Sequence, residues 1–210
     1  MQNNTQFILL AGGKSERMGV DKGLLKYQQT FWILEQLNRI SKTTISEVFI
    51  GLGYHYQHYF DSIPWFEDAL SKSINFQGLN VKIVINKQPQ FGAFSTLQTV
   101  LKKCNIQDEI IINHIDIPIL NTVEFEKLLE TQNVAVIPAF KVKKGHPIKL
   151  SNSFWRQLLT VNLKSEDARL DYQLKKLPAK NISFITVNDT SIIKNLNTKQ
   201  DWISYLKSIN

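Results

Sequence analysis

The sequence contains one cysteine, Cys104, in 210 residues, so an internal disulfide is impossible. No group of His and Cys residues has the spacing of a zinc site, and no apolar run approaches the ~20 residues of a membrane-spanning helix. Residues 1–6 lack the basic segment and the long apolar segment of a signal peptide. These absences predict a protein of the reducing cytoplasm, without a structural metal and without a membrane partner.

The composition is that of a globular protein. Hydrophobic residues make up 43% and charged residues 20% of the chain, and no tract is of low complexity. A length of 210 residues suffices for one sizeable domain but not for two ordinary ones, and no segment rich in Pro, Gly and Ser separates two parts. We therefore expect a single domain over residues 1–210, in which the polar, lysine-rich residues 140–180 form the substrate-facing part.

Positive charge is concentrated in the last third of the chain. Residues 134–210 carry 13 Lys and Arg but only five Asp and Glu, within a net charge of +7. This favours either a surface that attracts a phosphorylated substrate or nucleic acid, or lysines that only solvate helix faces and loops. Because the chain lacks a platform of alternating aromatic and basic residues, nucleic acid is the least favoured partner.

Apolar, β-branched segments alternate with stretches of helical spacing along most of the chain. The expected strands are residues 7–10, 48–52, 81–85, 109–113, 134–139 and 183–187. Apolar residues recur with helical spacing in residues 31–40, around 100–101 and in residues 125–129. This alternation predicts an α/β protein with a mostly parallel sheet covered by helices.

A glycine-rich, basic loop follows the first expected strand. Gly12 and Gly13 can adopt positive φ and leave space for backbone N–H groups to converge on a phosphate oxygen. Lys14, Arg17 and Lys22 add three cations, which can neutralise different phosphates of a triphosphate. The loop has neither the three spaced glycines of a dinucleotide-binding loop nor the G-x-x-x-x-G-K-[ST] spacing of a Walker loop. It therefore predicts a nucleotide site of another type.

The string L-A-G-G-x-S-x-R-M-G-x-x-K, which runs from Leu10 to Lys22, resembles the signature of the MobA-like nucleotidyltransferases. That group includes molybdenum cofactor guanylyltransferases and cytidylyltransferases. The resemblance implies a single-domain, Rossmann-like three-layer sandwich of the nucleotide-diphospho-sugar transferase type. It also implies a set of nucleotide-binding residues, namely Leu10, Ala11, Gly12, Gly13, Lys14, Ser15, Arg17, Lys22 and, from the later segment Gly92–Leu97, Ser95.

The strand over residues 109–113 is followed by Asp116 and Pro118. Pro cannot extend a central strand, so Asp116 is expected at the carboxyl edge of the sheet, where open α/β sheets bind ligands and where the glycine loop also lies. A hard carboxylate there suits Mg²⁺ held between protein and phosphates. The D-x-P pattern also resembles the family's metal-binding motif. His114 is expected on the opposite face of the strand, with a structural role.

The segment from Asn195 to Asp201 resembles the closing N/D-x-N/D-T-P-E-D motif of the family, which supplies a metal oxygen and starts the last helix. The resemblance implies that Asn197 assists Asp116 in holding Mg²⁺. Many cytidylyltransferase relatives have acidic residues where this chain has Asn195 and Asn197, so the site holds less negative charge. Thr198 is expected to cap the last helix.

Two residues are implied on the acceptor side. Gly145-His146-Pro147 follows a lysine-rich turn and is similar to the G-H-P turn of the cytidylyltransferase branch, which makes His146 an acceptor-binding candidate. Arg169 resembles another family arginine near the second substrate. The residues from Val20 to Leu25 and the Asn197-Thr198 pair look more like the guanylyl branch, so the motifs are divided on the base.

Aromatic residues crowd the segment from Tyr54 to Gln77. They suit a ring-binding platform, a dimer contact or, as we expect here, a locally packed loop and helix. Within this segment His55 and His58 have no neighbouring carboxylate or Cys in the sequence, so no metal site is predicted for them.

Together these motifs predict a Mg²⁺-dependent nucleotidyltransferase. It would transfer NMP from CTP or GTP to a phosphorylated small-molecule acceptor, molybdopterin by resemblance, and release pyrophosphate. Arg17, Lys22 and Asp116 are the predicted catalytic residues, and the expected state is a monomer or weak homodimer. Two alternatives stay open: a sugar-phosphate or other metabolite nucleotidyltransferase on the same fold, and a catalytically weak nucleotide-binding module.

Overall fold

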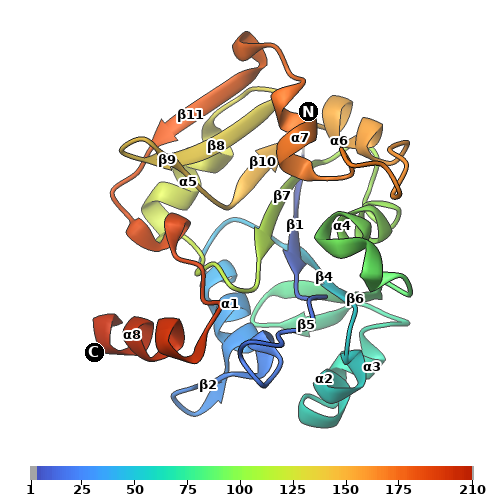
Figure 1. Ribbon diagram of the computed structural model, residues 1–210, viewed down its shortest axis with the longest axis vertical. Coiled ribbons are helices and arrows are strands. Elements are labelled where there is room, and N and C mark those ends of the chain that lie inside the picture. Colours follow the sequence, from blue (N-terminus) through green and yellow to red (C-terminus); the bar gives the residue numbers. More distant parts are fainter. Residues whose placement is uncertain (1–3, 210) are drawn as a thin grey trace.

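The computed structural model describes residues 4–209, in which nine strands form one sheet with helices on both faces (Figure 1). The strands are β1 (Thr5–Leu10), β4 (Glu47–Leu52), β5 (Ile74–Phe76), β6 (Leu79–Ile85), β7 (Glu109–His114), β8 (Ala135–Phe140), β9 (Lys143–Lys144), β10 (Ile148–Leu150) and β11 (Ile182–Thr186). Two further strands, β2 (Lys26–Tyr27) and β3 (Thr30–Phe31), form a separate small sheet.

The main sheet has the order β11-β8-β10-β7-β1-β4-β6-β5, and β9 pairs with β8. Its six longest strands run in one direction: β1, β4, β6, β7, β8 and β11. Each of them overlaps a strand expected from the sequence. The predicted α/β fold with a mostly parallel sheet is therefore confirmed. The three short strands β5, β9 and β10 run in the opposite direction and were not predicted.

The helices are α1 (Trp32–Ile40), α2 (Tyr56–Ser62), α3 (Trp65–Asp68), α4 (Gly92–Leu101), α5 (Thr122–Glu130), α6 (Asn152–Leu158), α7 (Leu170–Lys175) and α8 (Lys199–Ile209). They bury two separate apolar cores against the sheet. Helices α1, α2, α3, α5 and α8 contribute to one core, and α4, α6 and α7 contribute to the other. The three layers arise because successive residues of each central strand face opposite cores: Ile111 of β7 packs in the first, Ile110 and Ile112 in the second. No described helix has the length and apolar character to cross a membrane.

The lysine-rich part of the chain contributes a buried central strand. In β10, the Lys149 side chain is fully buried, 3.0 Å from the Glu109 carboxylate, and its Nζ donates a 2.7 Å hydrogen bond to the carbonyl oxygen of Leu129. A buried ammonium is tolerated only with such partners. Because the charge of Lys149 is compensated in this way, β10 can lie in the sheet between β7 and β8.

The aromatic segment forms α2 and α3 and packs locally, as expected. Tyr59 and Phe66 are buried and their rings are parallel, with centroids 6.4 Å apart, while Trp65 stacks on Phe76.

The neighbouring strands β1 and β7 determine where the site forms. Leu10 lies opposite His114 at the carboxyl ends of the two parallel strands. The loops that leave these strands, one carrying Gly12 and Gly13 and the other carrying Asp116, therefore start at the same edge of the sheet.

Candidate active site

The phosphate loop, which we define as residues 11–22, leaves β1 tightly against the end of β4. A Cβ atom on Gly12 would lie 2.9 Å from Thr96 Oγ1 and 3.1 Å from the Gly53 nitrogen, so only glycine fits there. The Gly12 carbonyl accepts a 3.2 Å hydrogen bond from the Tyr54 N–H. Farther along, the Met18 side chain is fully buried and anchors the loop. The exposed residues before and after Met18, among them Lys14 and Arg17, are left facing solvent.

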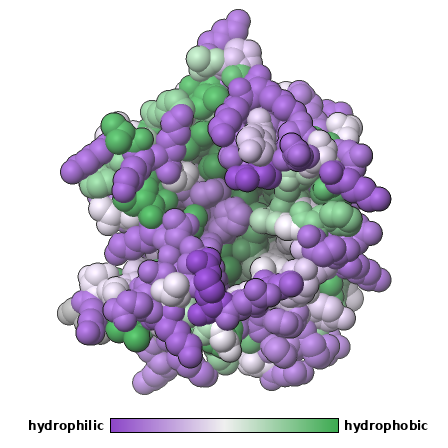
Figure 2. All heavy atoms as spheres, viewed as in Figure 1, coloured by the Kyte–Doolittle hydropathy of each residue, from purple (hydrophilic) through white to green (hydrophobic). Residues whose placement is uncertain are grey.

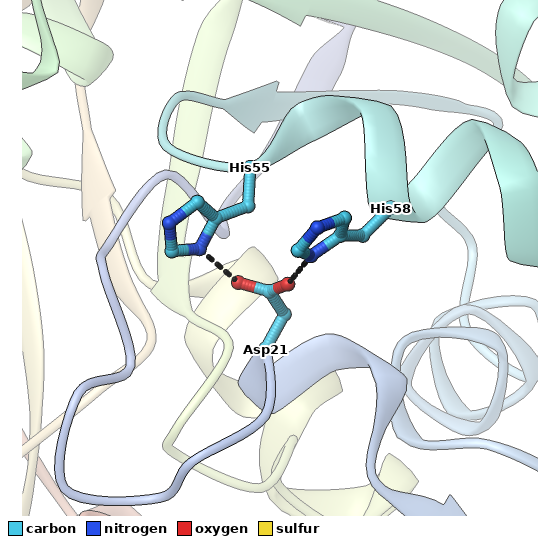
Figure 3. A group of neighbouring side chains, drawn as sticks. All are labelled: Asp21, His55 and His58. Atoms are coloured by element: carbon cyan, nitrogen blue, oxygen red, sulfur yellow. Dashed lines mark hydrogen bonds and ion pairs between the residues drawn. The ribbon is translucent and has the colours of Figure 1, made fainter.

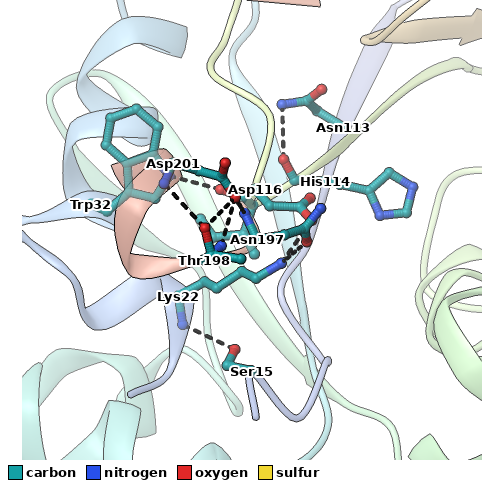
Figure 4. A network of polar contacts seen from close by, with 10 residues as sticks. Ser15, Lys22, Trp32, Asn113, His114, Asp116, Asn197, Thr198 and Asp201 are labelled. Atoms are coloured by element: carbon teal, nitrogen blue, oxygen red, sulfur yellow. Dashed lines mark hydrogen bonds and ion pairs between the residues drawn. The ribbon is translucent and has the colours of Figure 1, made fainter. Parts of the chain in front are cut away.

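Lys22 joins the phosphate loop to two distant segments (Figure 4). Its Nζ donates hydrogen bonds of 2.8 Å to Asp116 Oδ2 and 2.6 Å to Asn197 Oδ1. Its backbone N–H donates a 3.1 Å hydrogen bond to Ser15 Oγ within the loop. Three predicted site residues from three separate motifs thus meet around one ammonium group.

The position of Asp116 is fixed through the backbone around it. Trp32, fully buried in α1, donates from Nε1 to the Ile115 carbonyl at 2.7 Å, and the Leu196 N–H donates to the Asp116 carbonyl at 2.8 Å. Asn113 Nδ2 donates to the Ile117 carbonyl at 2.8 Å and closes the turn. The carboxylate is therefore preorganised, and it remains 21% exposed toward the cleft.

A reciprocal cap starts α8 and places Asn197. The Asp201 N–H donates to Thr198 Oγ1 at 3.1 Å, and the Thr198 N–H donates to Asp201 Oδ2 at 2.8 Å, which confirms the predicted helix cap. The Thr198 hydroxyl and N–H hydrogen bonds lower the pKa of Asp201, and nearby Arg17 acts in the same direction.

The cleft beside Asp116 continues toward the lysine-rich segment. One cavity of about 600 Å³ is lined by His114, Asp116, Gly145, His146 and Asn195 among others. An adjoining cavity of about 410 Å³ shares both histidines and is also lined by Leu10 and Arg169. Figure 2 shows polar side chains around a hollow on this face of the molecule. His146 and Arg169, the two predicted acceptor-side residues, therefore line the same space.

The expectation for His114 was wrong. β7 ends at His114 and the chain turns at Ile115 and Asp116, so the alternation of a strand no longer relates the two side chains. His114 lines the cleft together with Asp116, and its ring lies edge-on to that of His146, with centroids 4.8 Å apart.

Both of these imidazoles are held neutral. Burial lowers the pKa of His146 to about 3, and the neighbouring His114 contributes to the shift. Burial also lowers the pKa of His114. They are accordingly neutral hydrogen-bonding groups in the cleft and not cations.

Acidification from pH 7 to pH 5 is expected to lower the free energy of unfolding. Unfolded imidazoles, with a pKa near 6.5, bind protons in this range, whereas buried His146 does not. Where the unfolded state binds more protons than the folded state, the free energy of unfolding falls as the pH is lowered. The loss from His146 should be about 2 kcal/mol at pH 5. Urea denaturation at both pH values measures it. H146Q should remove the part of the slope that comes from His146 and leave the part that comes from His114, whose pKa is also lowered; an unchanged slope in H146Q would assign it elsewhere.

Ser95 lies in the first turn of α4, where it is 1% exposed. Its Oγ accepts a 2.8 Å hydrogen bond from Asn86 Nδ2 and lies 2.7 Å from the Gly92 carbonyl, to which it donates. These bonds hold the start of α4 to the end of β6, and a contact between Ser95 and nucleotide stays a prediction.

The sequence did not reveal a cluster at the far end of the phosphate loop. Asp21 accepts hydrogen bonds from both His55 and His58, which start α2. Asp21 is 34 and 37 positions away from the two histidines in sequence, and only the packing of α2 against the loop brings it to them.

Comparison with known proteins gives one family and a set of similar folds. The model of the MobA-like NTP transferase domain matches residues 7–179. A comparison with curated proteins finds no match. Rv0371c from Mycobacterium tuberculosis H37Rv superposes with a TM-score of 0.76 at 16% identity, over 99% of both chains.

Two other solved structures have the same fold. The 4-diphosphocytidyl-2C-methyl-D-erythritol synthase from Anaerococcus prevotii DSM 20548 gives a TM-score of 0.72 at 14% identity, covering 99% of this chain and 96% of that one. HddC from Yersinia pseudotuberculosis, in complex with GMP-PN, gives a TM-score of 0.68 at 13% identity, covering 98% of this chain and 99% of that one. At such identities the likeness concerns the fold alone.

Proposed function

Because the chain belongs to the MobA-like NTP transferase domain family and is a nucleotidyltransferase, we propose that it transfers NMP from CTP or GTP to a phosphorylated small-molecule acceptor. Molybdopterin is the acceptor that the family resemblance implies. The observation that carries the proposal is the meeting of Lys22, from the phosphate loop, with Asp116 and Asn197 at one edge of the sheet.

In this reaction an acceptor phosphate oxygen forms a bond to the α-phosphorus, the bond from the α-phosphorus to the bridging oxygen breaks, and pyrophosphate leaves. Such a transfer depends on positioning and charge neutralisation and needs no protein nucleophile. The cleft supplies these: backbone N–H groups at Gly12 and Gly13 and the exposed Lys14 face the triphosphate, and Arg17 neutralises its β,γ end. Lys22 stabilises the charge that develops around the α-phosphorus.

The residues around Lys22 also suit a divalent cation. The Lys22 ammonium is contacted by two oxygen atoms, Asp116 Oδ2 and Asn197 Oδ1. We infer that the same two oxygens would hold a metal cation. Oxygen ligands of this kind fit Mg²⁺ or Mn²⁺. A crystal structure of Rv0371c contains manganese, which supports a divalent cation in this fold. Asp116 and Asn197 would hold such an ion, which would neutralise phosphate charge, and Lys22 would then turn to the substrate.

The acceptor is proposed to enter beside β10 and α7. The space lined by His114, His146 and Arg169 borders Asp116 and includes none of the phosphate loop residues 11–22 in its lining. Neutral imidazoles there donate hydrogen bonds to acceptor oxygens without adding charge. Arg169 is 62% exposed and lies 3.0 Å from Asp171, an exposed ion pair that an acceptor phosphate can replace. The chemistry of this pocket would equally admit a sugar phosphate, which is the main alternative acceptor.

Adding a nucleotide that binds the folded protein is expected to raise its melting temperature. With Mg²⁺ and a ligand at 100 times its Kd, the stabilisation is about 2.7 kcal/mol. We expect CTP or GTP to give the largest shift among the four NTPs, and R17A to reduce it. If no NTP shifts the melting temperature, with or without molybdopterin, the nucleotide-binding role of the loop is wrong. Binding without turnover in the presence of acceptors would instead favour the catalytically weak binding module.

A further inference from the structure

Asp21 and two histidines form a compact group at the far end of the phosphate loop (Figure 3). The Asp21 carboxylate lies between the two rings, with Oδ1 3.1 Å from His55 Nδ1 and Oδ2 2.7 Å from His58 Nδ1. The Asp21 side chain is 5% exposed, whereas His55 and His58 are 49% and 60% exposed. A buried oxygen donor is thus covered by two accessible nitrogen donors.

Asp21 lacks a permanent cationic partner among residues 4–209. The adjacent Lys22 points away, to Asp116, and the side-chain partners recorded for the Asp21 carboxylate are the two imidazoles. Buried carboxylates are costly unless a positive charge compensates them. The two imidazoles hydrogen-bond to the carboxylate, and a divalent cation held by the same three side chains would complete its neutralisation.

The three donor atoms already converge. Each lies within 4.8 Å of the other two, and His55 and His58 are one helical turn apart at the start of α2. Ligands at about 2.0–2.2 Å from one tetrahedral ion lie roughly 3.3 Å from each other. Small side-chain rotations would reach that spacing. A cavity of about 580 Å³ lies against the group and leaves a fourth position open to water.

We propose that Asp21, His55 and His58 form a binding site for a divalent cation of the Zn²⁺ class, separate from the cluster of Lys22, Asp116 and Asn197. Two imidazoles and one carboxylate favour Zn²⁺ over Mg²⁺, which prefers oxygen ligands alone. The ion links the end of the phosphate loop to α2. It therefore fixes the backbone that carries Lys22 at the neighbouring position, and this binding does not depend on the proposed reaction.

Calorimetric titration of the full chain with Zn²⁺, in the absence of nucleotide, tests the site. One Zn²⁺ should bind per chain, and H58Q and H55Q should each weaken binding by more than about 100-fold, beyond the loss typical of outer-shell changes. His58 is exposed, so H58Q should fold normally. Two control variants should bind Zn²⁺ as the unchanged protein does: Q57A, an exposed position on the same helix, and D116N, which alters the other candidate cation site.

Co²⁺ substitution provides an independent reading, because four-coordinate Co²⁺ has a visible absorption that H58Q should abolish and Q57A should keep. Three results would overturn the proposal. The full chain could fail to bind Zn²⁺, H55Q and H58Q could bind Zn²⁺ as tightly as the unchanged protein does, or D116N could be the only variant that loses Zn²⁺ binding. Since the titration contains neither nucleotide nor acceptor, it stands or fails separately from the nucleotidyltransferase reaction.

Discussion

Replacing Lys22 with alanine is expected to lower turnover by about 10²–10³-fold, the loss typical when one preorganised charge-stabilising group is removed. Lys22 is the cation of the phosphate loop that reaches Asp116, and its side chain is only 16% exposed. In the proposed reaction it faces the α-phosphorus, where charge develops in the transition state. The loss should therefore appear in kcat and kcat/KM alike, measured as pyrophosphate release with Mg²⁺ and acceptor.

The matched control for this variant is K26A. Lys26 follows the phosphate loop, is exposed, and lies over the Phe31 ring at 3.9 Å, outside the cleft. K26A should keep normal turnover. Because the pair of Lys22 and Asp116 is partly exposed, K22A should change the free energy of unfolding by only about 1 kcal/mol. Normal turnover in K22A, with the fold intact by circular dichroism, would remove Lys22 from the mechanism.

Periodicity in the sequence was sufficient to predict the six main strands and the α/β fold. The central strands β1, β4 and β7 are buried on both faces, so their residues are almost continuously apolar, as in residues 109–113. By contrast, β10 is three residues long and contains Lys149, whose charge is satisfied only by Glu109 and Leu129. Both partners of Lys149 are distant in sequence, so the local composition around β10 could not indicate that this lysine is buried.

The site was predictable to the extent that its residues belong to local motifs. The phosphate loop, Asp116 and Asn197 each stand in a recognisable string, and parallel strand order brings their ends to one edge. The position of His114 was not predictable, because it depends on where the strand stops and the turn begins. The group of Asp21, His55 and His58 has no local string at all, since it forms only when α2 packs against the loop.

Replacing Asp116 with asparagine is expected to reduce turnover by at least about 10²-fold and to raise the metal concentration needed for half-maximal turnover. Asparagine keeps the shape of the side chain but removes the one carboxylate that faces Lys22 in this cluster, and Asn197 offers only an amide oxygen in support. The remaining ligands would hold Mg²⁺ or Mn²⁺ through neutral oxygens, which bind these ions weakly. Turnover measured across a range of metal concentrations separates weakened metal binding from a direct loss of rate.

The opposite change at the second ligand is the most informative comparison. N197D adds a carboxylate at the position where many cytidylyltransferase relatives are acidic, and its Oδ1 already lies 2.6 Å from the Lys22 ammonium. If Asp116 and Asn197 hold the catalytic cation, N197D should lower the metal concentration for half-maximal turnover while D116N raises it. If both variants raise the metal concentration for half-maximal turnover, the added charge of N197D acts by holding Lys22 in place. If neither variant changes this concentration, the cation is held elsewhere, and Asp116 and Asn197 serve only to position Lys22.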